Sequence, residues 1–207
     1  MNKLEFNRIH VNLNKLTELI DLNNEVNCLD IFAKEGDWQS FNFINKFDNY
    51  EAWDIDQNSL KILKNKFPTA VTNARDSISY INQNKKSITN LLIIDNSLNC
   101  YGENREYCEH FDFIENVGNI LYDESYIILN VCLKPFGLDN FPDWKLRREK
   151  FYKVEDTSNL NIDYLKSFYV NLFEKNNLKV IKTYSLVKEY FNEVDYLYYF
   201  MFKILKK

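Results

Sequence analysis

Short runs of aliphatic and β-branched residues alternate along the chain with stretches in which apolar residues recur at helical spacing. The short runs predict five successive strands, over residues 27–32, 50–55, 69–74, 90–95 and 125–133. The run at 90–95, NLLIID, is apolar almost throughout, which is typical of a central parallel strand covered on both faces. The helical spacing predicts a leading helix and four helices between the strands, over residues 13–24, 38–47, 58–67, 76–84 and 106–121.

The last third of the chain has a different pattern. Residues 134–157 contain two prolines and predict an irregular segment, and residues 162–175 then predict a helix. Two more strands follow over 178–187 and 195–205. The polar connection between them is short enough for a hairpin and too short for a crossover helix.

This order of elements predicts the fold class. Alternating strands and helices indicate an α/β fold with a doubly wound, mostly parallel sheet, helices on both faces and a C-terminal antiparallel β-hairpin. No internal repeat and no linker divides the chain, so we expect one domain over residues 1–207. Residues 1–26 are then a leading helical segment, and residues 134–157 are a candidate substrate lid.

Composition narrows the class of protein. Hydrophobic residues make up 45% of the 207, which is enough for one core and excludes a disordered chain. A net charge of −4 argues against a basic face that grips nucleic acid. The four cysteines form no CxxC pair, so we expect reduced thiols of a cytoplasmic protein and no metal site. The start of the chain lacks a signal-peptide core, and no apolar run approaches the roughly 20 residues of a membrane helix, so we expect no membrane contact.

Acidic residues stand at or just after the ends of the first four strands. They are Asp30, Asp54, Asp76 and Asp95. Right-handed crossovers bring the carboxyl ends of parallel strands to one edge of the sheet, where ligands bind. The separation of Asp30 and Asp54 is close to the roughly 20 residues between a nucleotide-binding turn and its ribose acid. A carboxylate suits that role because its two oxygens accept hydrogen bonds from both ribose hydroxyls.

On these residues, over roughly 27–133, the sequence resembles the class I S-adenosylmethionine-dependent methyltransferases, which have a Rossmann-like fold. LDIFAKEG stands where that family has its acidic, glycine-containing first loop, and Gly36 is the one glycine kept of about three. The resemblance implies that S-adenosylmethionine is the cofactor and that the loop meets its methionine end. The implied cofactor contacts are Asp30, Phe32, Ala33, Lys34, Glu35 and Gly36 in this loop, Asp54 and Ile55 at the ribose, Asp76 and Ser77 at the adenine, and Asp95 and Asn96 beside the methyl group.

The segment after the fourth strand is expected to face the reacting methyl group. It contains His110, whose ordinary pKa suits the removal of a proton from a methyl acceptor. We therefore name His110 and Asp95 as the catalytic candidates, although a single histidine in a helix is more often structural. Asp56 is expected to cap a helix, and Asp76 can cap a helix while it also meets the adenine.

The substrate and the partners stay open. The acidic net charge favours a small-molecule or sugar-type substrate over a polyanion. Basic and aromatic residues in 134–157 fit a solvated segment better than a nucleic-acid contact. The tyrosines and phenylalanines in 196–202 are expected in the core, and any exposed part is a candidate homodimer contact.

Two other functions remain as alternatives. Lys34 in place of a glycine favours a non-catalytic Rossmann-like binding module that has lost its cofactor. An aminopropyltransferase-type enzyme on the same fold would use the decarboxylated cofactor, and the acidic strand ends are compatible with it.

Overall fold

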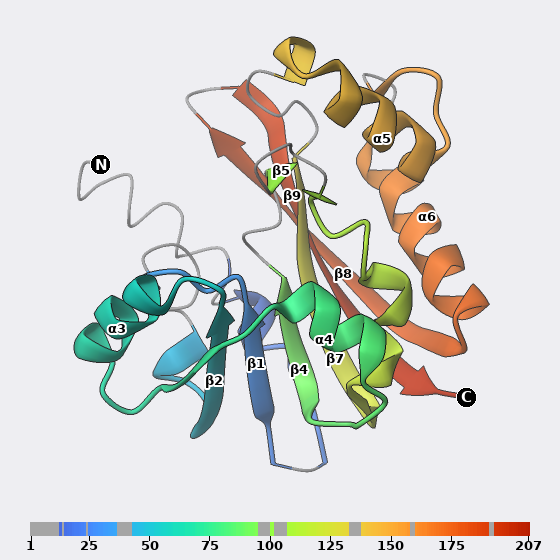
Figure 1. Ribbon diagram of the computed structural model, residues 1–207. Helices are drawn as coiled ribbons and strands as arrows, with labels where there is room; N and C mark the ends of the chain where they lie inside the picture. Colours follow the sequence, from blue (N-terminus) through green and yellow to red (C-terminus); the bar gives the residue numbers. More distant parts are fainter. Residues whose placement is uncertain are drawn as a thin grey trace.

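The computed structural model describes residues 13, 15–23, 25–36, 43–94, 100–101, 107–132, 138–157, 160–190 and 193–207. They form a seven-stranded sheet in the order β3-β2-β1-β4-β7-β9-β8 (Figure 1). Its strands are β1 (Asn27–Ile31), β2 (Asn49–Asp54), β3 (Val71–Ala74), β4 (Thr89–Ile94), β7 (Leu121–Cys132), β8 (Leu178–Tyr190) and β9 (Glu193–Lys206). The first five are parallel to one another, whereas β9 is antiparallel to both β7 and β8. The α/β fold class and the terminal hairpin are therefore confirmed.

Helices cover both faces of this sheet. Alternate residues of β1 belong to different cores, with Leu29 and Ile31 in one and Cys28 in the other. The first core is closed by α4 (Ser77–Gln83), the 3-10 helix η1 (Ile114–Asn119) and α6 (Ile162–Lys175). The second core is closed by α3 (Gln57–Lys66) and by residues before β1, among them Leu13 and Leu16. Because both faces are covered, the central strand β4 is buried at every position.

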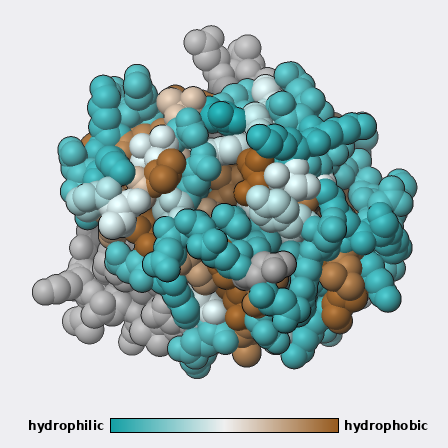
Figure 2. All heavy atoms as spheres, turned by 90° about the horizontal axis from the view of Figure 1, so that it is seen from below, coloured by the Kyte–Doolittle hydropathy of each residue, from teal (hydrophilic) through white to brown (hydrophobic). Residues whose placement is uncertain are grey.

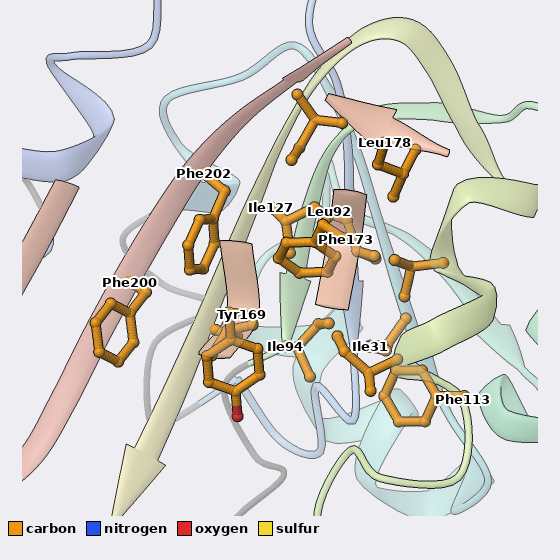
Figure 3. Close-up of a cluster of buried hydrophobic side chains, with 14 of the residues drawn as sticks. Ile31, Leu92, Ile94, Phe113, Ile127, Tyr169, Phe173, Leu178, Phe200 and Phe202 are labelled. Carbon is orange, nitrogen blue, oxygen red and sulfur yellow. The ribbon is translucent and has the colours of Figure 1, made fainter. Parts of the chain in front are cut away.

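Aromatic side chains dominate the first core. Figure 3 shows Tyr169 and Phe173 of α6 against Phe200 and Phe202 of β9, and the rings of Phe173 and Phe202 lie 5.1 Å apart in an edge-to-face pair. Tyr198 is buried with them. Tyr198, Tyr199, Phe200 and Phe202 therefore belong to the core, as expected.

Most predicted elements exist with small boundary shifts, but the helix predicted over 106–121 is wrong. That stretch contains β6 (Tyr107–Cys108), which pairs with β5 (Cys100–Tyr101), then a turn, and then η1. Glu109 has a φ of 49°, a left-handed conformation that cannot continue an α-helix. The apolar residues Ile114, Val117 and Ile120 recur every three positions, a spacing that serves a 3-10 helix as well as an α-helix.

The segment 134–157, predicted as irregular, contains a helix that the pattern missed. Helix α5 (Pro142–Tyr152) begins with a proline in its first turn and ends at Lys153, whose φ is 57°. Its buried and exposed positions invert the usual rule, because Arg148 is fully buried while Leu146 is 62% exposed. The hydrophobic periodicity of residues 142–152 therefore did not predict helix α5. Of the predicted helices over 13–24 and 38–47, the described residues that are helical are 13, 15–17 and 43–44.

The edge of the sheet where the parallel strands begin faces the viewer in Figure 2 and is mostly hydrophilic. The carboxyl ends of these strands lie at the opposite side of the molecule (Figure 1). None of the helices in the described ranges is both long and apolar enough to cross a membrane.

Candidate functional site at the carboxyl ends of the strands

Three of the four predicted acids lie at the carboxyl ends of adjacent strands. Asp30 is the penultimate residue of β1 and Asp54 is the last residue of β2. Asp76 follows β3 by two residues. The three strands are parallel neighbours, and Asp54 is in register with Ala74 at the end of β3. The predicted convergence of Asp30, Asp54 and Asp76 on one edge is therefore confirmed, while Asp95 and Asn96 lie outside the described residues.

Asp54 connects the three loops of this edge. One carboxylate oxygen, Oδ2, accepts a hydrogen bond from the backbone N–H of Lys34 at 3.0 Å, and Oδ1 accepts one from the N–H of Asp56 at 2.9 Å. The backbone carbonyl of Asp54 accepts a third from the N–H of Arg75 at 2.9 Å. The side chain is only 7% exposed. Each carboxylate oxygen has a second lone pair, so Asp54 retains acceptor capacity for a ligand.

The loop after β1 has an alternating backbone conformation. Phe32, Lys34 and Gly36 have φ values of 62°, 46° and 73°, all in the left-handed region that favours glycine. Hydrogen bonds hold this loop to β2 and to itself, from Ala33 N–H to the Trp53 carbonyl and from Gly36 N–H to the Ala33 carbonyl. The chain thus adopts a glycine-type loop although two of its three left-handed positions are not glycine.

Of the two glycines in the described ranges, Gly36 is the one with a positive φ. A Cβ there would lie 3.3 Å from Leu63 Cγ and 3.3 Å from Phe67 Cε2, in addition to the strain of its positive φ. Close packing of this loop against α3 therefore depends on the one glycine that the sequence keeps.

The residues that follow β2 and β3 present different groups. Ile55 is 76% exposed, which is unusual for a large aliphatic side chain. Asp76 caps α4, with Oδ1 accepting from the N–H groups of Ile78 and Ser79. Ser77 is buried, and its Oγ has no hydrogen-bond partner among the described residues. Asp56 caps α3 as predicted, and hydrogen bonds from Ser59 and Asn58 lower its pKa.

Arg75 is held by aromatic rings. Its guanidinium lies 4.7 Å from the ring centre of Trp53 and 4.3 Å from that of Tyr80. Both contacts are within the range of cation–π attraction. These contacts hold the positive charge of Arg75 against Trp53 of β2 and Tyr80 of α4.

Asp30 is more deeply buried than the prediction implied. The Tyr50 hydroxyl donates to its Oδ2 at 2.6 Å, on the face of the sheet that Asp30 shares with Cys28. Burial, and secondarily the charge of Asp30, raises the pKa of the Cys28 thiol. Asp30 is therefore 2% exposed, and its carboxylate is bonded to a side chain of the protein itself.

The expected proton acceptor His110 lies inside the protein. Its ring is fully buried, and Nε2 shares a hydrogen bond of 2.5 Å with the Tyr169 hydroxyl. Burial, and secondarily the charge of Arg148, lowers the pKa of His110 to about 3. In this structure the ring has no exposed surface at which a methyl acceptor could lose a proton to it, so His110 is not part of the function proposed below.

Beside His110 lies a buried ion pair that the sequence did not predict. Arg148 of α5 donates through Nη1 to Glu109 Oε1 and through Nη2 to the carbonyl oxygen of Cys132 at 2.7 Å. Trp144 Nε1 donates to the same Glu109 oxygen at 3.3 Å. The pair therefore joins α5, the turn after β6 and the carboxyl end of β7. Burial raises the pKa of the Glu109 carboxyl against the opposing effect of Arg148.

No group of three or more His, Cys, Asp or Glu side chains able to hold a metal ion occurs within the described ranges. The described strands form a seven-stranded sheet whose penultimate strand in space, β9, runs antiparallel, with Asp54 and two neighbouring loops at the carboxyl ends of the parallel strands.

This is the fold of the class I S-adenosylmethionine-dependent methyltransferases, as solved structures show. Over 100% of both chains, the protein is similar to the N-methyltransferase NodS from Bradyrhizobium japonicum WM9, with 11% identity and a TM-score of 0.61. It is also similar to magnesium protoporphyrin IX methyltransferase (ChlM) from Synechocystis PCC 6803 with bound SAH. That match has 12% identity and a TM-score of 0.59 over 100% of this chain and 88% of the other.

A third similar structure is M. jannaschii TYW2 in complex with AdoMet, at 16% identity and a TM-score of 0.52 over 96% of this chain and 76% of the other. No family model and no curated protein matches the sequence. The likeness therefore lies in the fold, and the identity of the ligand has to be argued from the site.

Proposed function

We propose that the protein is an S-adenosylmethionine-dependent methyltransferase that acts on a small-molecule or sugar-type substrate. The observation that carries this proposal is the position of Asp54. It ends β2, it holds the left-handed loop after β1 through the Lys34 N–H, and it keeps a free lone pair on each carboxylate oxygen. The presence of AdoMet or SAH in similar structures supports the same ligand.

The residues around Asp54 fit the parts of this cofactor. Asp54 would accept hydrogen bonds from the ribose hydroxyls, and Ile55 would offer its exposed apolar side chain to the adenine. Asp76 and Ser77 would lie at the adenine edge, where the unpartnered Ser77 Oγ has capacity for a hydrogen bond. Asp30 and the loop of Phe32, Ala33, Lys34, Glu35 and Gly36 that follows it would lie at the methionine end.

The bound cofactor would supply an activated methyl group on a sulfonium centre. The protein's task is then to align the acceptor with that group. Asp95 and Asn96 follow β4 directly in the sequence, and we propose that they line the transfer site.

Calorimetric titration of the purified protein with S-adenosylhomocysteine tests the proposal. Ligand at about 100 times its dissociation constant should stabilise the fold by about 2.7 kcal/mol, which a thermal shift also detects. Asp54→Asn removes the charge that accepts from the ribose, and we expect it to weaken binding about tenfold or more. The matched control is Asp123→Asn, an exposed aspartate in β7, which should bind like the wild type.

Failure of the wild-type protein to bind either S-adenosylmethionine or S-adenosylhomocysteine would contradict the proposal and favour a non-catalytic module. Unchanged affinity in Asp54→Asn would reject the ribose assignment. Once binding is established, a donor with an isotopically labelled methyl group, incubated with small-molecule extracts, identifies the acceptor.

A further inference from the structure

Lys34 is unusual among the three left-handed residues of the first loop. Gly36 is a glycine, and the half-buried Phe32 packs its ring 5.7 Å from that of Phe113. Lys34 has a φ of 46°, yet its side chain is exposed, and no residue in the described ranges forms a hydrogen bond or ion pair with its ammonium group. A glycine would serve the backbone here without strain.

The side chain of Lys34 therefore adds nothing to the folded protein that offsets its backbone strain. Its N–H already bonds to Asp54 Oδ2, and a glycine would supply the same N–H. Residues in strained backbone conformations cluster at active sites and ligand clamps. The backbone N–H of Lys34 bonds to Asp54, so a nucleoside held by Asp54 would lie near the flexible cationic side chain of Lys34.

The charges around the site point to the ligand group involved. The described residues of this edge, 32–36, 54–57 and 74–78, include four carboxylates and two cations, Lys34 and Arg75. The Arg75 guanidinium is stacked on Trp53 and Tyr80. An anionic ligand group at this acidic edge is repelled by the carboxylates unless a cation lies beside it. Of Lys34 and Arg75, Lys34 is the one whose side chain is exposed.

We infer that Lys34 binds the carboxylate of the amino-acid part of the cofactor and makes the site selective for cofactors that retain it. This inference rests on the proposed function. It also separates that function from the aminopropyltransferase alternative, because the cofactor of the alternative lacks this carboxylate.

The test compares two ligands by calorimetry. One is S-adenosylhomocysteine, and the other is S-adenosyl-3-thiopropylamine, which differs from it only by lacking the carboxylate. We expect the wild type to prefer S-adenosylhomocysteine, and Lys34→Met to lower that preference about fivefold. Lys34→Arg should retain most of the preference because it keeps the positive charge. The control Lys85→Met, at an exposed lysine beyond α4, should not alter it.

Added salt supplies a second readout, since the preference of the wild type should fall as ionic strength rises, while that of Lys34→Met should barely change. Equal losses of affinity for both ligands in Lys34→Met would overturn the inference and leave the proposed function standing. A wild-type preference for S-adenosyl-3-thiopropylamine would overturn the inference and support an aminopropyltransferase. If the wild type bound neither ligand, the proposed function and the inference would both fail.

Discussion

The buried pair of Glu109 and Arg148 allows a sharp prediction about stability. Both side chains are buried, and Arg148 reaches Glu109 and the Cys132 carbonyl at the same time. Replacement of Arg148 by methionine keeps much of the packing volume but leaves the Glu109 carboxylate buried, with Trp144 as its one side-chain donor among the described residues. Loss of one partner of a buried ion pair costs about 3–5 kcal/mol, a large share of the roughly 5–15 kcal/mol that stabilises a typical domain.

The neighbouring Arg147 supplies a matched control on the same helix. It pairs with Asp112 at 2.7 Å, but the two side chains are 34% and 28% exposed, so we expect Arg147→Met to cost about 1 kcal/mol or less. Glu109→Gln combined with Arg148→Met removes both charges, and its cost should fall well below the sum of the two single changes.

Urea denaturation of the wild type, Glu109→Gln, Arg148→Met and the double variant gives the coupling energy of the pair, and Arg147→Met is measured beside them as the control. Since burial raises the pKa of Glu109, the carboxylate left by Arg148→Met can take up a proton, and the cost of this variant should shrink at lower pH. If Arg148→Met cost no more than Arg147→Met, or if the single costs were additive, the argument from burial would be refuted.

Two other stability predictions follow from the structure. The pKa of His110 is lowered to about 3, so between its ordinary value of about 6.5 and about 3 the unfolded chain binds a proton that the folded protein excludes. The neutral His110 ring therefore contributes fully to the free energy of unfolding above about pH 6.5. Below that pH its contribution falls by about 1.4 kcal/mol per pH unit. The difference in unfolding free energy between wild type and His110→Gln should therefore narrow on acidification, and a difference independent of pH would count against the buried neutral ring. Gly36→Ala should destabilise the fold by about 1–2 kcal/mol because of its φ of 73°. A Cβ at Gly118 would be equally crowded, at 3.2 Å from Leu178, but Gly118 lacks a positive φ. Gly118→Ala should therefore cost less than Gly36→Ala when both are measured by thermal unfolding.

Sequence patterning predicted the sheet well because the parallel strands are buried on both faces. Strand β4, for example, is buried at every position, and its apolar run is visible without knowledge of its neighbours. The same logic brought Asp30, Asp54 and Asp76 to one edge, since the direction of parallel strands follows from their crossovers. What Asp54 does there was not predictable, because its partners are backbone N–H groups of Lys34 and Asp56 whose positions depend on the loops.

The sequence by itself determined the α/β class, the terminal hairpin and the edge at which the acidic residues meet, because each follows from local periodicity and chain order. Only the tertiary structure decided the fate of residues whose environment comes from distant segments. Arg148 lies in the core because Glu109, 39 positions away, neutralises it there. His110, which local pattern made a candidate base, is enclosed by α6 through Tyr169. Local sequence encodes which residues prefer water, whereas pairing across the fold decides which polar groups can do without it.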